Sequence, residues 1–169
     1  IDSPVELKEL YAYCQNEIAK NFSQIGVTEA KYVISSMEKE FGGPPSEKAQ
    51  RYDELSPFSY DLEQGGNLGI LKYTPLRTYH DADVNWQIHN RRRSLKDMNI
   101  TPASEMINQL VILGNEKAEL IMSVGTGVRG NGQRHPHSMS IMDEKDFVIW
   151  CLKNLNIPIN SANLKSSGN

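Results

Sequence analysis

The residues best suited to chemistry gather in one stretch, 124–137, which contains four glycines, two arginines and two of the chain's four histidines. A pair of imidazoles can act as general base and general acid on a phosphodiester, and no metal is needed when a ribose hydroxyl is the nucleophile. The pattern therefore supports a small histidine-dependent nuclease or phosphoesterase that would use His89, His135 and His137 as catalytic residues.

A basic cluster accompanies these histidines. Arginine suits phosphate recognition because its planar guanidinium donates two hydrogen bonds at once and is weakly hydrated. Tyr73, Tyr79 and Trp86 are interleaved with the cluster and could stack on bases. The leading expectation is thus a nucleic-acid-binding module, for RNA or single strands, in which the glycine-rich loop also approaches the strand closely. The residues expected to contact nucleic acid are Arg91, Arg92, Arg93, Lys96, Arg129 and Arg134.

The glycine spacing Gly125-x-Gly127-x-x-Gly130 matches the dinucleotide-binding fingerprint and follows a predicted strand. That fingerprint requires a helix directly after it, whose N-terminus faces the pyrophosphate. Asn131 and Pro136 do not permit such a helix. A loop explains the glycines without a ligand, and we expect no cofactor.

A metal site is the other alternative at the two histidines. In an extended segment, His135 and His137 could both reach one ion, and Glu144 is the nearest acidic residue that could complete the site. Glu144 begins a predicted helix, however, and the two cysteines, Cys14 and Cys151, lack any metal-binding spacing. We expect no metal.

The elements that position these residues predict an α+β fold, which begins with a helical hairpin over residues 1–43. A capping box at residues 3–6 starts a helix that is apolar on one face and ends at Gly26. Thr28 caps a second helix that runs to Phe41. Because the apolar face is long, the hairpin could serve as an arm through which the protein forms homo-oligomers.

Residues 44–156 predict the α+β core: a small, mostly antiparallel sheet with two apolar helices packed on it. Val84, Trp86 and Ile88 alternate with polar residues, so a strand there would place His89 in solvent. Residues 157–169 predict a loose tail. The predicted strands comprise residues 69–74, 76–79, 84–88 and 118–124, and the predicted helices residues 46–55, 101–113 and 143–155.

Composition narrows the partners and the compartment. The net charge of −3 is uneven, since residues 1–62 carry −5 whereas residues 63–140 carry +2 and all four histidines. This asymmetry is consistent with a polyanion-binding face. No apolar run approaches the roughly 20 residues of a membrane span, so no membrane partner is expected. Two cysteines on apolar helix faces favour buried thiols and the cytoplasm or another reducing compartment.

A third interpretation involves no catalysis or nucleic acid. The chain could be a structural protein that assembles through its N-terminal helices. The sequence leaves this alternative open beside nucleic-acid binding and histidine-dependent cleavage.

Overall fold

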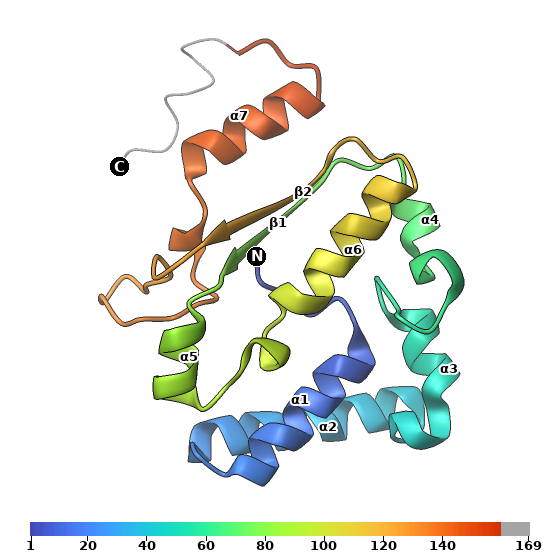
Figure 1. Cartoon of the computed structure of the whole chain (residues 1–169), viewed down its shortest axis with the longest axis vertical. Helices are drawn as coiled ribbons and strands as arrows, with labels where there is room; N and C mark the ends of the chain where they lie inside the picture. The colour runs from blue at the N-terminus through green and yellow to red at the C-terminus, as the bar shows by residue number, and fades with distance from the viewer. Residues whose placement is uncertain (160–169) are drawn as a thin grey trace.

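The structure is a computed structural model that describes residues 1–159, and helices dominate it (Figure 1). The predicted tail lies mainly outside the described residues, because it covers 157–169. The helices are α1 (Leu7–Lys20), α2 (Gln24–Phe41), α3 (Pro45–Leu55), α4 (Leu68–Leu71), α5 (Val84–Arg91), α6 (Ile100–Ile112) and α7 (Glu144–Asn154). The strands are β1 (Leu76–Asp81) and β2 (Ala118–Ser123), and three short 3-10 helices are η1 (Glu63–Gly65), η2 (Leu95–Asp97) and η3 (Met139–Ile141).

The two strands pair in parallel, with Leu76 opposite Ala118 and Asp81 opposite Ser123. The prediction of a small, mostly antiparallel sheet is therefore wrong, although helices and a small sheet do share the chain. Parallel strands need a long crossover connection, and here α5 and α6 supply it. Both strands consequently end at the same edge of the sheet.

Two segments predicted as strands are helices. Residues 84–88 belong to α5, which begins where the Asp83 side chain accepts the Trp86 backbone N–H at 3.0 Å. An alternation of only three apolar residues does not outweigh such a cap, and Ile88 is in fact 43% exposed. The strand predicted over residues 69–74 does not form either, because Leu68–Leu71 is the single helical turn α4 and residues 72–74 continue as a turn.

The helical hairpin turns earlier than the glycine pattern predicts. Asn21 takes a left-handed conformation (φ 47°) and ends α1. Ser23 then caps α2 through the N–H of Gly26, so neither Gly26 nor Thr28 marks a helix boundary. Gly26 instead permits close packing inside the hairpin, since a Cβ there would lie 3.0 Å from the Glu17 carboxylate.

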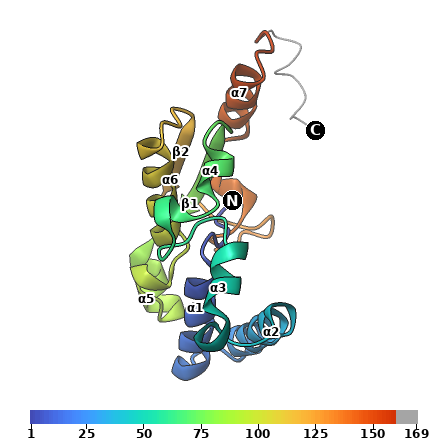
Figure 2. The same cartoon turned by 90° about the vertical axis from the view of Figure 1, so that its right-hand side faces the viewer.

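Two hydrophobic clusters hold the chain together. One lies between the sheet, α4 and α6, and its buried members are Val5, Phe58, Leu68, Ala103, Met106, Ile107, Leu110 and Ala118. The other joins the hairpin to α3 through Tyr11, Met37 and Tyr52. The hairpin and α7 lie at opposite ends of the molecule, as both views show (Figures 1 and 2).

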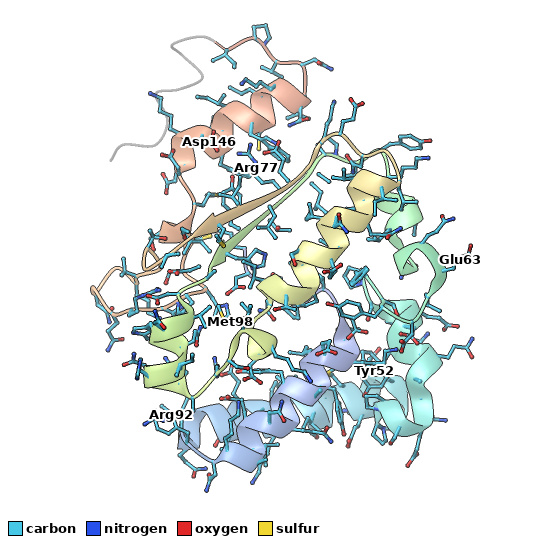
Figure 3. The ribbon with its side chains drawn as sticks, in the orientation of Figure 1. Tyr52, Glu63, Arg77, Arg92, Met98 and Asp146 are labelled. Carbon is cyan, nitrogen blue, oxygen red and sulfur yellow. The ribbon has the colours of Figure 1, made fainter. Side chains whose placement is uncertain are left out.

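The opposite face of the sheet carries α7. The Arg77 guanidinium lies 2.6 Å from Asp146 of that helix (Figure 3), and the Tyr79 ring packs edge-on against Phe147. The N-terminal segment runs beside β1, because the Asp2 N–H donates to the Tyr79 carbonyl at 2.8 Å. None of the helices within residues 1–159 combines the length and apolar character needed to cross a membrane.

Candidate functional site

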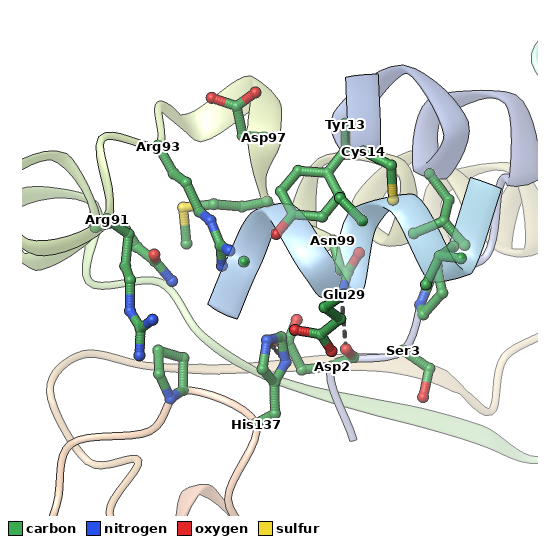
Figure 4. A pocket seen from close by; sticks show the side chains of 18 of the residues that line it. Asp2, Ser3, Tyr13, Cys14, Glu29, Arg91, Arg93, Asp97, Asn99 and His137 are labelled. Atoms are coloured by element: carbon green, nitrogen blue, oxygen red, sulfur yellow. Dashed lines mark hydrogen bonds and ion pairs between the residues drawn. The ribbon is translucent and has the colours of Figure 1, made fainter. Parts of the chain in front are cut away.

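A cavity of about 370 Å³ lies between the hairpin, α5, the N-terminal segment and residues 135–137 (Figure 4). Part of its wall is apolar, formed by Leu10, Ala30 and Val33. The remaining wall is polar and combines both signs of charge. In the close view Arg91 lies toward one end and Cys14 toward the other. Segments 80–93 and 124–137, which are far apart in the sequence, both contribute to this cavity.

Asp81 brings those two segments together. It is only 1% exposed at the end of β1, and its carboxylate accepts the backbone N–H groups of Gly125 at 2.9 Å and Gly127 at 2.6 Å. The Arg134 guanidinium lies 2.7 Å from the same carboxylate. Burial opposes the charge of Asp81, but Arg134 and the two N–H groups outweigh burial and lower the pKa of Asp81. The loop after β2 is thus fastened to the end of β1.

Gly127 allows the loop to fold back on itself. A Cβ at this position would lie 2.6 Å from the carbonyl oxygen of His135, and the His135 N–H donates to the Gly127 carbonyl at 2.8 Å. These contacts position His135 at the cavity. We predicted that the backbone of the glycine-rich loop approaches a nucleic-acid strand. Two N–H groups of this loop, those of Gly125 and Gly127, cannot donate to such a strand because Asp81 already accepts them.

Asp2 connects two histidines and was not found from the sequence. One carboxylate oxygen lies 2.8 Å from Nδ1 of His80, and the other lies 2.7 Å from Nδ1 of His137. Burial raises the pKa of Asp2, but the two histidines outweigh it and lower this pKa to about 2. His80 is 2% exposed, and its Nε2 has no hydrogen-bond partner within residues 1–159.

His135 and His137 share one side of the cavity. Their ring centroids are 5.5 Å apart, and the rings meet edge to face. Burial lowers the pKa of His135, and the positive charges of Arg129, His137 and Arg91 lower it further. The Glu29 carboxylate acts in the opposite direction. The His135 ring is therefore neutral at pH 7.

His89 does not join this pair. It lies exposed on α5, whereas Gln87 and Arg91 of the same helix line the cavity. At 100° per residue, His89 points to the opposite side of the helix from those two. The structure thus brings two of the three predicted catalytic histidines together.

Some side chains of the predicted basic cluster form ion pairs within the protein, and others form none within residues 1–159. Arg93 makes a two-pronged ion pair with Glu17, at 3.1 and 2.8 Å, and Arg134 pairs with Asp81. Arg91 lines the cavity, and its guanidinium lies 5.6 Å from the centre of the Trp86 ring. Of the six residues predicted to contact nucleic acid, four have no ion pair in the described part of the chain: Arg91, Arg92, Lys96 and Arg129.

Arg92 adopts a left-handed conformation (φ 57°) that ends α5, so the three consecutive arginines point in different directions. Its guanidinium lies 5.0 Å from the centre of the Phe22 ring (Figure 3). The cation–π contact places Arg92 near the turn between α1 and α2. The run of three arginines is therefore not a single phosphate-binding patch.

Two further cavity residues escaped sequence reasoning. The Oε1 atom of Gln87 is buried and has no hydrogen-bond partner within residues 1–159, so it can accept a hydrogen bond from a ligand. Glu29 adds a second free acceptor on α2. Burial, foremost, raises the pKa of Cys14 to about 11, so its thiol is protonated at pH 7 and is a poor nucleophile.

The metal alternative finds no support in the described residues. Within 1–159, no group of three or more histidine, cysteine, aspartate and glutamate side chains has an arrangement that could hold an ion. Glu144 lies in the first turn of α7.

Comparison with protein-family models, with curated proteins and with solved structures finds no match for this chain.

Proposed function

We propose that the protein binds single-stranded nucleic acid, with one nucleotide of the strand in the cavity beside Arg91, His135 and His137. The observation that carries this proposal is the meeting of these three side chains in a cavity of about 370 Å³. Small-molecule sites typically have volumes of about 300–1,000 Å³, so the cavity has room for a ligand of nucleotide size.

The distribution of donors and acceptors favours a nucleotide over a simple anion. Arg91 and the histidines can donate to a phosphate, while Gln87 and Glu29 can accept from a ribose hydroxyl or a base amino group. A simple anion would leave the Gln87 oxygen unpaired and would be repelled by Glu29. Only a ligand that contains both kinds of group complements the whole wall.

An extended strand is favoured because free basic residues continue beyond the cavity. Arg92 and Lys96 are exposed, and each is a sequence neighbour of a residue that lines the cavity. Arg129 is close enough to affect the pKa of His135. Phosphates on either side of the bound nucleotide would meet these three side chains.

The test is the fluorescence anisotropy of a short, labelled, single-stranded oligonucleotide. With four free basic residues, the slope of log affinity against log salt reaches at most about −3, at roughly 0.7 per phosphate. We expect Arg91→Ala to weaken binding about tenfold, the value of one charged hydrogen bond. Arg51→Ala is the matched control, because Arg51 is equally cationic and lies exposed on α3, away from the cavity.

Absence of binding at low salt would contradict the proposal. So would an equal loss of affinity in the Arg91 and Arg51 variants, because that result would show only a general response to net charge.

A further inference from the structure

We propose that this cavity also cleaves RNA: the ribose 2′-hydroxyl attacks the neighbouring phosphorus atom, with His135 as general base and His137 as general acid. This inference rests on the proposed function, because a phosphodiester must first occupy the cavity. The observation behind it is the pair of cavity histidines, each with a polar neighbour at Nδ1 and no hydrogen-bond partner at Nε2 within residues 1–159.

In each of the two imidazoles, Nδ1 is the nitrogen that contacts another side chain. Nδ1 of His137 lies 2.7 Å from the Asp2 carboxylate, and Nδ1 of His135 lies 3.4 Å from the Ser138 hydroxyl. No hydrogen bond within residues 1–159 engages Nε2 of either ring. With ring centroids 5.5 Å apart, both imidazoles are close enough together to contact one phosphate group.

Asp2 acts as a positioning residue. A carboxylate at Nδ1 fixes the tautomer and orientation of an imidazole, and it neutralises the ring when the ring is protonated. With its pKa lowered to about 2, Asp2 retains its charge at any pH at which RNA binding is practical. Protonated His137 then carries on Nε2 the proton that the leaving oxygen requires.

The base role of His135 agrees with its surroundings. Burial lowers its pKa, and Arg129, His137 and Arg91 add to that effect, whereas Glu29 opposes it. The ring is neutral at pH 7 and can accept a proton at once. A neutral imidazole at the cavity wall is what the general-base role requires.

The step is balanced without any further reactant. The 2′-oxygen forms a bond to phosphorus, its proton passes to Nε2 of His135, and the bond from phosphorus to the 5′-oxygen breaks. The 5′-oxygen leaves with the proton from Nε2 of His137. The products are a 2′,3′-cyclic phosphate and a 5′-hydroxyl, and Arg91 stabilises the additional negative charge on the non-bridging phosphate oxygens in the transition state.

The experiment compares one labelled RNA with the DNA of the same sequence, which lacks the 2′-hydroxyl. Binding is followed by anisotropy and cleavage by denaturing gel. We expect the protein to bind both strands and to cut only the RNA, leaving 2′,3′-cyclic phosphate ends. With enough protein to bind all of the RNA, His135→Ala and His137→Ala should each reduce the cleavage rate about 100-fold or more, while Arg51→Ala leaves that rate unchanged.

The outcomes separate the two proposals. RNA that is bound but remains intact overturns cleavage and leaves the binding proposal standing, whereas absence of binding to either strand overturns both. Cleavage that persists in the histidine variants comes from another enzyme and also overturns the inference. If an alanine variant does not fold, as judged by circular dichroism, His135→Asn and His137→Gln replace it, because they keep a polar side chain without the acid–base function.

Two further kinetic measurements distinguish a role in catalysis from a purely structural role. Asp2→Asn should lower kcat far more than it changes KM, because the substitution disturbs the orientation of the His137 ring and leaves the contacts of the substrate in place.

The acid limb of the pH–rate profile should lie below pH 6.5. Arg129→Ala should move this limb to higher pH, since removal of a positive neighbour raises the pKa of His135. A profile that does not move in the Arg129 variant contradicts His135 as the base.

Discussion

Asp81 and Asp2 each join distant segments of this protein, but they differ in whether their partners keep unused hydrogen-bonding groups. Asp81 binds two backbone N–H groups and one guanidinium, and each of these groups has its main hydrogen bond inside the protein. Asp2 binds two imidazoles and leaves the far nitrogen of each without a partner in the described chain. A network whose hydrogen-bonding groups all have partners stabilises the conformation of the loop. A network with unpaired groups at a cavity wall can bind a ligand through those groups.

The first way to break this comparison is to remove Asp81. We expect Asp81→Ala to lower the free energy of unfolding by about 3–5 kcal/mol, because Arg134 and two N–H groups lose a buried partner. Urea denaturation measures the change. A loss below about 1 kcal/mol would mean that the loop does not depend on this network.

Gly127→Ala tests the same network from the loop side. The new Cβ would lie 2.6 Å from the His135 carbonyl oxygen, and we expect a loss of stability of about 3 kcal/mol, at the upper end for overpacking. Gly130→Ala is the matched control, because a Cβ there meets nothing within 4 Å and the backbone needs no positive φ. Thermal unfolding should separate the two variants, and equal melting temperatures would contradict the close approach.

Asp2 gives a pH-dependent effect of intermediate size. Its pKa falls from 3.8 to about 2 on folding, which corresponds to about 2 kcal/mol of stabilisation for a side chain that is 10% exposed. Because the folded pKa is the lower one, this stability is present above pH 4 and is lost as the pH falls toward 2. Asp2→Asn should therefore be less stable than the wild type at pH 6 and equally stable near pH 2, and a constant difference would contradict the assignment.

The smallest effect should come from Glu29, which faces the same cavity but holds no partner in the described residues. We expect Glu29→Gln to strengthen oligonucleotide binding about two- to fivefold, since it removes a like charge and keeps an acceptor. The melting temperature should remain within a degree or two, because the side chain is exposed. Weaker binding in this variant would indicate that Glu29 accepts a hydrogen bond for which its charge is essential.

The sequence predicted most helices of this fold because their signals are local. Asp143 caps α7 by accepting the Asp146 N–H at 2.8 Å. The capping box predicted at residues 3–6 does not form, because Glu6 itself caps α1 by accepting the Glu9 N–H and the Ser3 hydroxyl donates to the Ile1 carbonyl. Sequence reasoning failed over residues 84–88, where three alternating apolar residues resembled a strand and the cap at Asp83 was overlooked. The sheet direction was also wrong, because strand pairing depends on the packing of the crossover helices and no short pattern records it.

For the candidate site, the sequence predicted His135 and His137 from their proximity along the chain, and both line the cavity. It could not identify Asp2 or Glu29, because single acidic residues carry no signal until the fold brings them to the cavity. It also overestimated the basic cluster, since the ion pairs of Arg93 with Glu17 and of Arg134 with Asp81 form between distant segments. Which charges remain free is therefore known only from the tertiary structure.

The reach of Asp2 also has a consequence for the order in which the protein forms. Its contact with His137 joins the N-terminal segment to a loop that is synthesised long after it. A growing chain can complete both hydrophobic clusters around the hairpin and α6 before residues 124–137 leave the ribosome. The histidine pair then assembles after both clusters, so a cleaving site would exist only in chains whose two hydrophobic clusters have already formed.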